Sequence, residues 1–405
     1  MRVLLSTIGS RGDVQPLVAL ALELTALGQE TRLCVPPDFQ AWIAGLGLAV
    51  TPIGPELRAM MATKPAAPAA GPMTPERRRE LAEASVAAQF QAVAAAAEGC
   101  DLIVAATALQ IAARSVAEVR GIPYVFTAYC PTVLPSPLHA PPPLPAMPGE
   151  PAAPPADNRE AWDRDGARFS AVFGSALNAH RAALGLAPVD DVRGHVFTDR
   201  PWLAADPVLA PWPDPADDTI FQPGAWLLRD ERPLSGDIEA FLSDGPPPVY
   251  FGFGSMRAAP DLGRVMIEAA RALGRRAIVS RGWADLDIDG QADCLAIDEV
   301  NQQALFPRVA AVVHHGGAGT TTAAALSGAA QIIVPQIYDQ HYFARRVHDL
   351  GIGLAHAAGT PSTASLATAL EGALRPEIGA RAHWATTAVR RDGARIAAER
   401  IIAQR

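Results

Sequence analysis

A chain of 405 residues is long enough for two domains of ordinary size. Its hydrophobic fraction of 49% provides for sizeable cores, and its net charge of −8 argues against nucleic acid or an anionic membrane as partner, because both favour a concentrated basic surface. The single lysine, Lys64, stands in an Ala/Pro stretch and no Gly-Lys-Ser/Thr sequence is present. A P-loop nucleotide site is therefore excluded, and a lysine Schiff-base enzyme is disfavoured.

The cysteines and the apolar stretches indicate in which cellular compartment the protein is expected. Cys34, Cys100, Cys130 and Cys294 form no Cys-x-x-Cys pair, which favours reduced thiols over a zinc site or disulfides. The longest apolar stretch, 102–113, is shorter than the roughly 18 residues of a membrane helix, and the N-terminus lacks a secretory signal pattern. We expect a soluble cytoplasmic protein.

The N-terminal half alternates between strand and helix patterns. The predicted elements are a strand at 1–7, a Gly/Ser turn at 9–12, a helix that ends at Gly28, strands at 31–35 and 102–106, a helix at 108–119 and a strand at 124–127. This alternation predicts a parallel, doubly wound sheet.

Two irregular stretches interrupt this half. Residues 60–75 are rich in Ala, Pro and Met, and residues 131–156 hold eleven prolines, which cannot form a helix or a central strand. Long loops of this kind in compact domains are functional lids or surface loops without a role, and both interpretations stay open.

The alternation restarts after a Pro/Asp-rich stretch. The predicted elements there are strands at 249–253, 277–280, 311–314 and 331–335, and helices at 321–326 and 394–403. We expect an N-terminal domain at 1–212, a linker at 213–219, a C-terminal domain at 220–384 and a C-terminal segment at 385–405.

Two glycine-rich segments follow predicted strands of the second half. The sequence His-His-Gly-Gly-Ala-Gly-Thr-Thr at 314–321 also opens a helix, whose N-terminus offers unpaired N–H groups and a positive dipole end to a diphosphate. His315 can donate to a phosphate, whereas His314 is interpreted as a packed residue at the end of the strand. The segment 252–255 is a weaker phosphate candidate. A plain strand-to-helix turn remains the alternative for both.

Two further loops follow strands and carry carboxylates. Asp13, in Gly-Ser-Arg-Gly-Asp at 9–13, is either the N-cap of the next helix or a general base. Asp339 and Gln340 suit sugar hydroxyls, with a capped loop as the alternative. Ligands of parallel sheets bind at the carboxyl ends of the strands, so we expect two such domains to face each other across a cleft that holds a nucleotide diphosphate.

Together these segments resemble a known family. The chain resembles family 1 inverting glycosyltransferases of the GT-B fold, in which two Rossmann-like domains face each other, and more closely the actinomycete enzymes that glycosylate vancomycin-group antibiotics. The segments that carry the resemblance lie at 9–16, 280–286, 299–303, 314–321 and 335–340. It implies transfer of a sugar from a UDP- or dTDP-sugar to a bulky aglycone, of the glycopeptide or the polyketide type, without a further cofactor. It also implies that the C-terminal helix packs back on the first domain.

The resemblance implies a role for each matching residue. Asp13 becomes the base that deprotonates the acceptor. The implied donor-binding residues are Arg11, without a more specific role; Ser10, Ser255, His315, Gly317, Gly319 and Thr320 around the phosphates; Val300 and Gln302 around the nucleobase and ribose; and Asp339 and Gln340 around the sugar.

The chain departs from the wider family at two positions. Glu299 stands where many relatives have a Trp that stacks on the base, so stacking must come from elsewhere, and Trp283 is the candidate. Ala323 stands where many relatives have a Glu that binds the ribose hydroxyls, and this difference favours dTDP slightly over UDP.

No Asp-x-Asp sequence lies at a predicted strand end, so we expect a metal-independent reaction that stabilises the diphosphate through the backbone. The alternatives are a nucleotide-sugar 2-epimerase and a non-catalytic nucleotide-sugar-binding protein.

Overall fold

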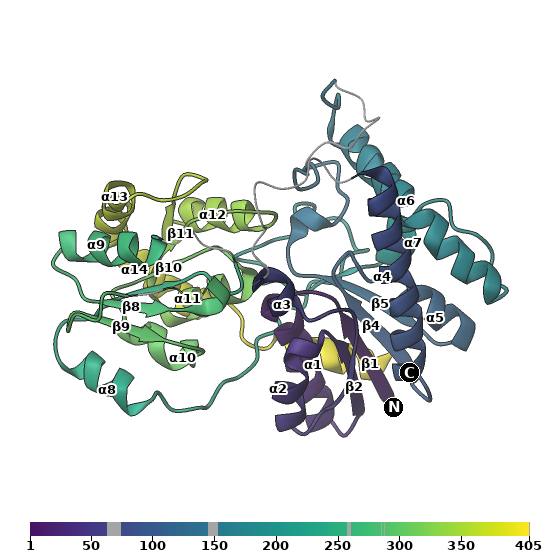
Figure 1. Cartoon of the computed structure of the whole chain (residues 1–405), viewed down its shortest axis with the longest axis horizontal. Coiled ribbons are helices and arrows are strands. Elements are labelled where there is room, and N and C mark those ends of the chain that lie inside the picture. Colours follow the sequence, from purple (N-terminus) through teal and green to yellow (C-terminus); the bar gives the residue numbers. More distant parts are fainter. Residues whose placement is uncertain (63–73, 145–152, 257–260, 285, 287, 405) are drawn as a thin grey trace. The chain divides into compact units, whose positions relative to one another are not determined.

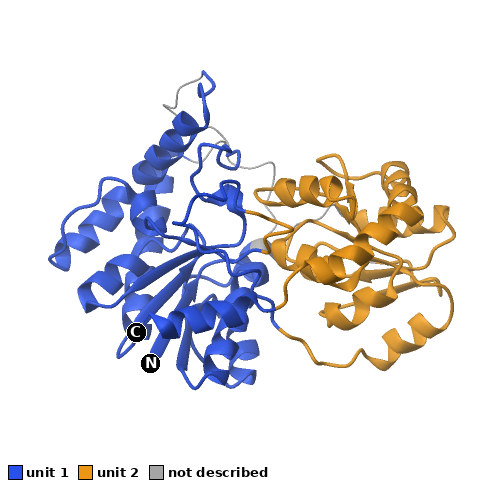
Figure 2. Ribbon diagram, turned by 180° about the vertical axis from the view of Figure 1, so that it is seen from behind, with its two compact units in different colours: residues 1–205, 212–228, 392–405 blue, residues 206–211, 229–391 orange. Residues whose placement is uncertain are grey.

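The structure, a computed structural model, describes residues 1–62, 74–144, 153–256, 261–284, 286 and 288–404 (Figure 1). It divides into two compact units (Figure 2). Unit 1 comprises residues 1–205, 212–228 and 392–405, and unit 2 comprises residues 206–211 and 229–391. Both are α/β units, as the strand–helix alternation predicts. Among the described helices, none combines the length and the apolar character needed to cross a membrane.

Unit 1 contains one six-stranded sheet. Its strands are β1 (Arg2–Thr7), β2 (Glu30–Val35), β3 (Ala49–Pro52), β4 (Leu102–Ala106), β5 (Tyr124–Ala128) and β6 (Trp202–Leu203). Its α-helices are α1 (Arg11–Ala26), α2 (Gln40–Gly45), α3 (Leu57–Ala62), α4 (Pro75–Ala96), α5 (Ala113–Arg120), α6 (Asn158–Ala183), α7 (Val192–Phe197) and α15 (Gly393–Ala403), with 3₁₀ turns η1 (Pro37–Phe39) and η2 (Pro131–Val133).

All pairs in this sheet are parallel, in the order β3-β2-β1-β4-β5-β6. β1 is central, and its Val3, Leu4 and Leu5 are fully buried because both faces of the sheet are covered. Burial of each such side chain contributes about 1.5–3 kcal/mol. The central position of β1 fixes the loop after it, at 8–10, on a rigid support.

Unit 2 repeats this plan. Its strands are β7 (Val249–Gly252), β8 (Ala277–Ser280), β9 (Cys294–Ile297), β10 (Ala311–His314), β11 (Ala330–Ile333) and β12 (Gly353–Ala355), in the all-parallel order β12-β11-β10-β7-β8-β9. Its helices are α8 (Gly236–Ser243), α9 (Leu262–Ala272), α10 (Gln302–Leu305), α11 (Ala318–Ser327), α12 (Gln340–Asp349), α13 (Thr363–Ala373) and α14 (Pro376–Ala388), with 3₁₀ turns η3 (Gly282–Ala284) and η4 (Phe306–Arg308).

The borders of the units differ from the expected linker at 213–219. Residues 212–228 belong to unit 1, where the Trp212 indole donates to Asp217 at 3.1 Å and Gln222 Nε2 donates to the carbonyl of Ala205 at 2.9 Å. Residues 206–211 belong to unit 2, where Arg346 Nη2 donates to the carbonyl of Val208 at 2.7 Å. Composition does not reveal these contacts, of which the Arg346–Val208 bond joins residues 138 positions apart.

The C-terminal helix α15 returns to unit 1. Gly393 lies so close to residues 224–225 that a Cβ there would be 2.4 Å from the carbonyl carbon of Gly224. Arg395 pairs with Glu23 of α1 at 3.7 Å. The return begins at Asp392, whereas the expected segment began at 385.

Candidate functional site

The predicted donor residues of unit 2 lie in loops at one edge of its sheet. Because the strands are parallel, the loops that follow them leave from the same edge. Asp339 and Gln340 follow β11, and His315, Gly317, Gly319 and Thr320 follow β10. Ser255 follows β7, Trp283 follows β8, and Val300 and Gln302 follow β9. The sheet thus gathers residues that are spread over more than 80 positions of the sequence.

His314 is the buried last residue of β10 and has a structural role. Its Nδ1 accepts from the N–H of Gly316 at 3.1 Å, so its Nε2 carries the proton and donates to Gln331 Oε1 at 3.0 Å. Burial lowers the pKa of His314 to about 3, which keeps the ring neutral. This agrees with the interpretation of His314 as a packed residue at the end of the strand.

His315 begins the glycine-rich loop. Burial lowers its pKa to about 4, against a smaller opposing effect of a hydrogen bond with the Gly252 backbone, so the imidazole is neutral at pH 7. A Cβ at Gly254 would lie 3.2 Å from His315 Cε1, and a Cβ at Gly317 would lie 2.7 Å from Nε2. Glycine at positions 254 and 317 therefore leaves room for the imidazole ring of His315.

The turn from β10 into α11 requires glycine at Gly316. Its φ is +97°, and a Cβ there would lie 2.6 Å from Ile333 Cγ2. Gly317 is the N-cap of α11, and the first bond within the helix runs from the N–H of Thr321 to its carbonyl at 2.9 Å. The N–H groups of residues 318–320 consequently have no partner within the helix, and a Cβ at Gly319 would meet open space. This helix end suits an anion.

The loops after β7 and β8 are tied together. The N–H of Trp283 donates to the carbonyl of Gly254 at 2.9 Å, and a Cβ at Gly282, whose φ is +57°, would lie 2.3 Å from the same oxygen. Ser255 follows directly and is half-buried. Ser255 and Trp283 therefore project from two neighbouring loops that hold each other in place.

The segment after β9 carries Glu299, Val300 and Gln302. Val300 is half-buried against the core, and Gln302 forms a side-chain hydrogen bond with Tyr250. Glu299 lies 3.4 Å from Arg232 Nη2, with both side chains exposed. An ion pair thus occupies the position where the resemblance implies an aromatic ring.

The loop after β11 differs from its expected arrangement. Asp339 is the N-cap of α12 and is half-buried. The Gln340 side chain is only 5% exposed, and its Oε1 accepts from the N–H groups of Gln336 and Ile337 at 2.8 and 3.2 Å. Its amide therefore bonds within the protein.

In unit 1, Ser10 and Asp13 form a capping box at the start of α1. The N-cap is Ser10, and Asp13 is the third helical residue, so the alternative of Asp13 as N-cap is wrong. Asp13 Oδ2 accepts from the N–H of Ser10 at 2.6 Å and from its hydroxyl at 3.2 Å. These two bonds, both donated by Ser10, fix the carboxylate at the start of α1, just after the central strand.

The surroundings of Asp13 suit a base. Burial raises its pKa to about 6, while the bonds from Ser10 act in the opposite direction. The hydroxyl of Tyr129 donates to the Asp13 backbone carbonyl at 3.0 Å and holds the first turn of α1. Sequence reasoning missed Tyr129, whose only signal is its position directly after β5.

Arg11 is engaged within unit 1. Its guanidinium carbon lies 3.5 Å from the centre of the Trp42 ring, and its Nε donates to Gln15 at 3.2 Å. Sequence reasoning placed Arg11 among the donor-binding residues and missed Trp42, because this cation–π contact joins segments 31 residues apart.

Apolar side chains are exposed on the segments that follow β3, β4 and β5. They are Met60, Leu109, Leu138 and Leu144, with exposures of 58, 48, 58 and 42%. The described part of the proline-rich stretch is anchored by His139, whose ring lies 5.9 Å from the Trp162 ring. Residues 63–73 of the stretch rich in Ala, Pro and Met, and residues 145–152 of the proline-rich stretch, lie outside the described residues.

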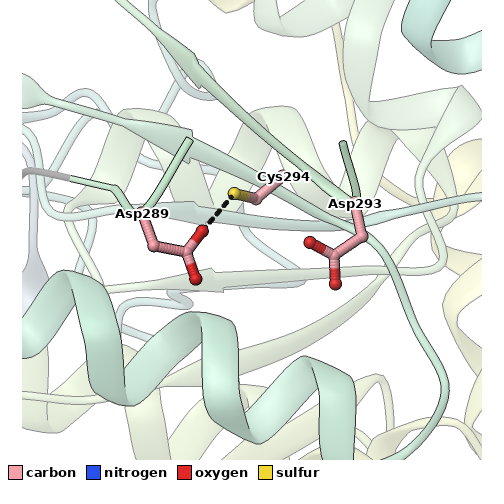
Figure 3. A group of neighbouring side chains, drawn as sticks. All are labelled: Asp289, Asp293 and Cys294. Atoms are coloured by element: carbon pink, nitrogen blue, oxygen red, sulfur yellow. Dashed lines mark hydrogen bonds between the residues drawn. The ribbon is translucent and has the colours of Figure 1, made fainter. Parts of the chain in front are cut away.

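A cluster of two carboxylates and a thiol in unit 2 has the spacing of a metal site. The possible ligand atoms of Asp289, Asp293 and Cys294 lie within 4.8 Å of one another (Figure 3). Arg271, however, pairs with Asp289 at 2.5 Å and with Asp293 at 2.6 Å, and it lowers the pKa of both carboxylates. The guanidinium supplies the charge that a cation would bring, so this is a salt-bridge cluster.

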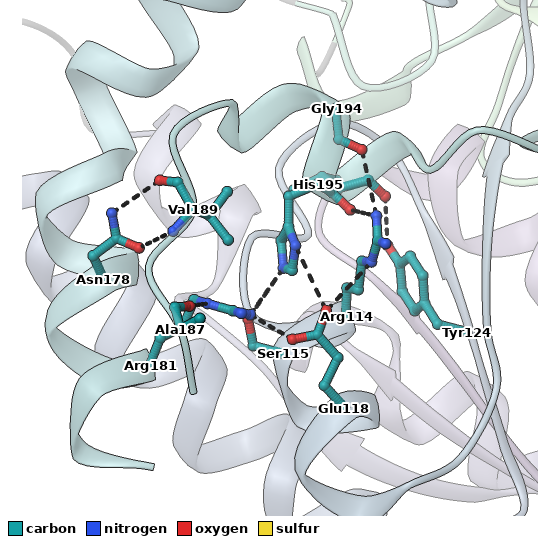
Figure 4. Close-up of polar contacts among 11 residues, drawn as sticks. Arg114, Ser115, Glu118, Tyr124, Asn178, Arg181, Ala187, Val189, Gly194 and His195 are labelled. Carbon is teal, nitrogen blue, oxygen red and sulfur yellow. Dashed lines mark hydrogen bonds and ion pairs between the residues drawn. The ribbon is translucent and has the colours of Figure 1, made fainter. Parts of the chain in front are cut away.

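A buried network in unit 1 has the residue types of a hydrolase triad. Ser115 Oγ lies 3.1 Å from His195 Nε2, and His195 Nδ1 lies 3.7 Å from Glu118 Oε1 (Figure 4). Arg181 Nη1 donates to Ser115 at 2.8 Å and to Glu118 at 2.6 Å, and Ser115 is fully buried. Because Ser115 is fully buried, no substrate can reach it, and the network has no catalytic role. Its structural role is to join α5, α6 and α7.

Comparisons with protein families match both units. Residues 3–136 match the description Glycosyltransferase family 28 N-terminal domain. Residues 292–394 match the description Erythromycin biosynthesis protein CIII-like, C-terminal domain. The first description names family 28, whereas the sequence motifs resemble family 1.

Comparisons with individual proteins cover the whole chain. It is 52% identical to Glycosyltransferase GtfE of Amycolatopsis orientalis, over 100% of this chain and 97% of that relative. It is 50% identical to the vancomycin aglycone glucosyltransferase of the same organism, over 99% and 97%. Among solved structures, the glycotransferase of kitacinnamycin matches with a TM-score of 0.74 and 20% identity, over 100% of this chain and 98% of that chain, which is a likeness of fold.

Proposed function

Because this chain belongs to the glycosyltransferases that combine a family 28 N-terminal domain with an erythromycin CIII-like C-terminal domain, we propose that it transfers a hexose from a UDP- or dTDP-sugar to a hydroxyl of a glycopeptide aglycone. The chain is a GT-B glycosyltransferase. The name of the relative that is 50% identical supports both the glycopeptide acceptor and the hexose. A polyketide acceptor is the alternative.

The observation that carries the proposed donor is the strand order of unit 2. The loop after β11 bears the residues assigned to the sugar, and the loops after β10 and β7 bear those assigned to the phosphates. The loops after β8 and β9 bear those assigned to the base and the nucleoside. This arrangement supports a nucleotide-sugar donor, because the assigned roles run from the sugar through the phosphates to the nucleoside along one edge of the sheet. Four steps between strands span about 19 Å, enough for an extended donor.

The diphosphate leaving group would be stabilised by the N-terminus of α11. Its N–H groups at 318–320 and the neutral His315 ring supply donors in fixed positions, which stabilise charge that develops on the departing phosphate. No metal ion is required for this. Transfer should therefore persist in EDTA, and loss of activity in EDTA that Mg²⁺ or Mn²⁺ restores would contradict the proposal.

Asp13 would act as the general base on the acceptor. It removes the hydroxyl proton as the oxygen attacks the anomeric carbon from the side opposite to the diphosphate, which inverts the configuration at that carbon. The raised pKa makes Asp13 a stronger base than an ordinary carboxylate while it remains ionised at pH 7.

The acceptor would bind to unit 1. Exposed Met60, Leu109, Leu138 and Leu144 offer apolar contacts on three segments at the same edge of the sheet, which suits a bulky, partly apolar aglycone. A chimera tests this division. With residues 229–391 replaced by those of a relative that uses another donor, the protein should keep its aglycone preference and adopt the donor preference of the relative. An aglycone preference that follows the replaced segment would contradict it.

A mass-spectrometric screen tests the proposed function as a whole. UDP- and dTDP-sugars are combined with glycopeptide, polyketide and simple aromatic aglycones, and we expect a mass gain of one sugar on the glycopeptide. Epimerised donor without an acceptor would instead identify an epimerase, and donor binding without turnover would identify a binding protein. The cytoplasmic location stays a prediction for cell fractionation.

A further inference from the structure

The first turn of α1, which carries Asp13, lacks one of the bonds of an ordinary helix. Pro16 lies inside α1 and has no N–H group, so the carbonyl of Gly12 does not receive the bond that residue 16 would otherwise donate. The carbonyl of Ser10 accepts from the N–H groups of Asp13 and Val14, at 3.0 and 3.2 Å. The turn is therefore one bond short, and a contact from outside the helix can make up for it.

Tyr129 supplies such a contact from the segment directly after β5. Its hydroxyl donates to the backbone carbonyl of Asp13 at 3.0 Å, across 116 positions of the sequence. Burial, together with the negative charge of Asp13, raises the pKa of the Tyr129 hydroxyl well above its usual value, so the hydroxyl keeps its proton and stays a donor. The bond therefore persists over the pH range in which the Asp13 carboxylate changes its charge.

The ring of Tyr129 is held by aromatic side chains of the same unit. Its centre lies 6.5 Å from that of Trp226, at an interplanar angle of 72°, and Trp226 is buried. Trp226 in turn lies edge to face against Trp202 of β6, with ring centres 6.5 Å apart. Aromatic pairs favour this edge-to-face geometry, so they hold the ring in the direction that brings its hydroxyl to α1.

We propose that Tyr129 is a positioning residue, whose hydroxyl fixes the first turn of α1 and thereby keeps the Asp13 carboxylate where it receives the proton of the acceptor. This inference rests on the proposed function, because it takes Asp13 as the general base. A phenol has one O–H proton, and that of Tyr129 is given to the Asp13 carbonyl. Tyr129 therefore acts through Asp13 and is not itself an acid or a base in the transfer.

Tyr129→Phe removes this bond and keeps the aromatic ring. We expect kcat to fall about tenfold or more, because a misplaced base loses much of its effect, while the affinity for UDP or dTDP stays unchanged. A looser turn also weakens the bonds from Ser10 that lower the pKa of Asp13, so the acid limb of kcat/KM should move to higher pH. Wild-type kcat in Tyr129→Phe, or an acid limb that does not move, would overturn the inference.

Tyr124→Phe is the matched control. Tyr124 is the first residue of β5, and its hydroxyl donates to the backbone carbonyl of Val196 in α7, also at 3.0 Å. The two substitutions thus remove the same kind of bond from the same unit, and urea unfolding should show a loss of stability in both. Only Tyr129→Phe should lose activity. An equal loss of kcat in Tyr124→Phe would identify general loosening of unit 1 as the cause and would overturn the inference.

A double-mutant cycle with Asp13→Asn distinguishes positioning from direct contact with the acceptor. If Tyr129 acts through the carboxylate, adding Tyr129→Phe to Asp13→Asn should lower kcat by less than about threefold, because the base is already lost. If Tyr129 acts on the acceptor independently, the two losses multiply, and the inference is wrong. A wild type that transfers no sugar, or an Asp13→Asn protein with wild-type kcat, refutes the proposed function instead, so the two failures are distinguishable.

Discussion

A Cβ at Gly9 would lie 2.2 Å from Oδ2 of Asp13, the carboxylate oxygen that accepts both hydrogen bonds from Ser10. The carboxylate is therefore held in space that any side chain at position 9 would take. Of the glycines in the Gly-Ser-Arg-Gly-Asp segment, only Gly9 has this relationship, because a Cβ at Gly12 would approach only Ser10 Oγ, at 3.8 Å.

The first prediction follows from this contact. Gly9→Ala should displace the Asp13 carboxylate and lower kcat by about 10²-fold or more, since a misplaced base loses much of its effect. The affinity for UDP or dTDP should not change. Gly12→Ala, one turn away, is the matched control and should keep both values; equal losses in both variants would contradict the role of the Gly9–Asp13 contact.

The pH dependence of activity tests the state of Asp13. Burial raises the pKa of Asp13 to about 6, and only the ionised form can accept a proton, so kcat/KM should fall tenfold per pH unit below about pH 6. The Ser10 hydroxyl bond lowers the pKa of Asp13, so Ser10→Ala should move the acid limb to higher pH. An acid limb near pH 4 that Ser10→Ala leaves in place would contradict this account.

His315 gives a prediction on donor affinity. His315→Ala should weaken the binding of UDP or dTDP by roughly 1.5–3 kcal/mol, the typical value of a hydrogen bond to a charged group. Calorimetry measures this directly. Because burial keeps the ring neutral, the affinity of the wild type should not follow a histidine titration between pH 6 and 8. Unchanged affinity in the variant would mean that His315 serves the fold alone.

The network around His195 predicts acid lability of the fold. Burial lowers the pKa of His195 from 6.5 to about 4, so below pH 6.5 the unfolded chain binds a proton that the folded chain does not. The stability that this group contributes is complete above pH 6.5 and is lost as the pH falls towards 4, with a slope of up to about 1.4 kcal/mol per pH unit.

Urea unfolding at several pH values measures that slope. His195→Gln removes the titrating group and should reduce the dependence of the free energy of unfolding on pH, whatever its effect on stability at pH 7. His383→Gln, at an exposed position of α14, is the control for the change of residue type. An identical slope in wild type and His195→Gln would argue against this assignment.

The order of elements could be predicted from local pattern, because strands in a parallel sheet are short apolar runs and the loops after them are rich in glycine. The strand at 311–314 and the glycine-rich turn after it follow from such signals. The helix predicted at 108–119 begins only at Ala113, because Thr107 adopts a φ of +72° and Gln110 is buried to bond with Ser6. No local pattern encodes these contacts.

Within the candidate site, the sequence shows which residue types follow each strand, but it does not show which contacts each side chain makes in the folded chain. Residue type and position suit Gln340 to sugar hydroxyls, and the resemblance implies that Arg11 is a donor-binding residue. In the structure Gln340 bonds to the backbone of its own loop, and Arg11 stacks on Trp42. Both uses depend on partners that only the folded chain brings within reach.

The central claim is that Asp13 is the general base of the transfer, and one substitution measures it most directly. Asp13→Asn keeps the size of the side chain and removes its basicity. Product formation from the nucleotide sugar and the aglycone, and the dissociation constant of UDP or dTDP, are measured on the same preparation. We predict a loss of 10²–10⁴-fold in kcat, of the order typical for general-base catalysis, with unchanged nucleotide affinity. A folded Asp13→Asn protein with kcat close to that of the wild type would contradict the account.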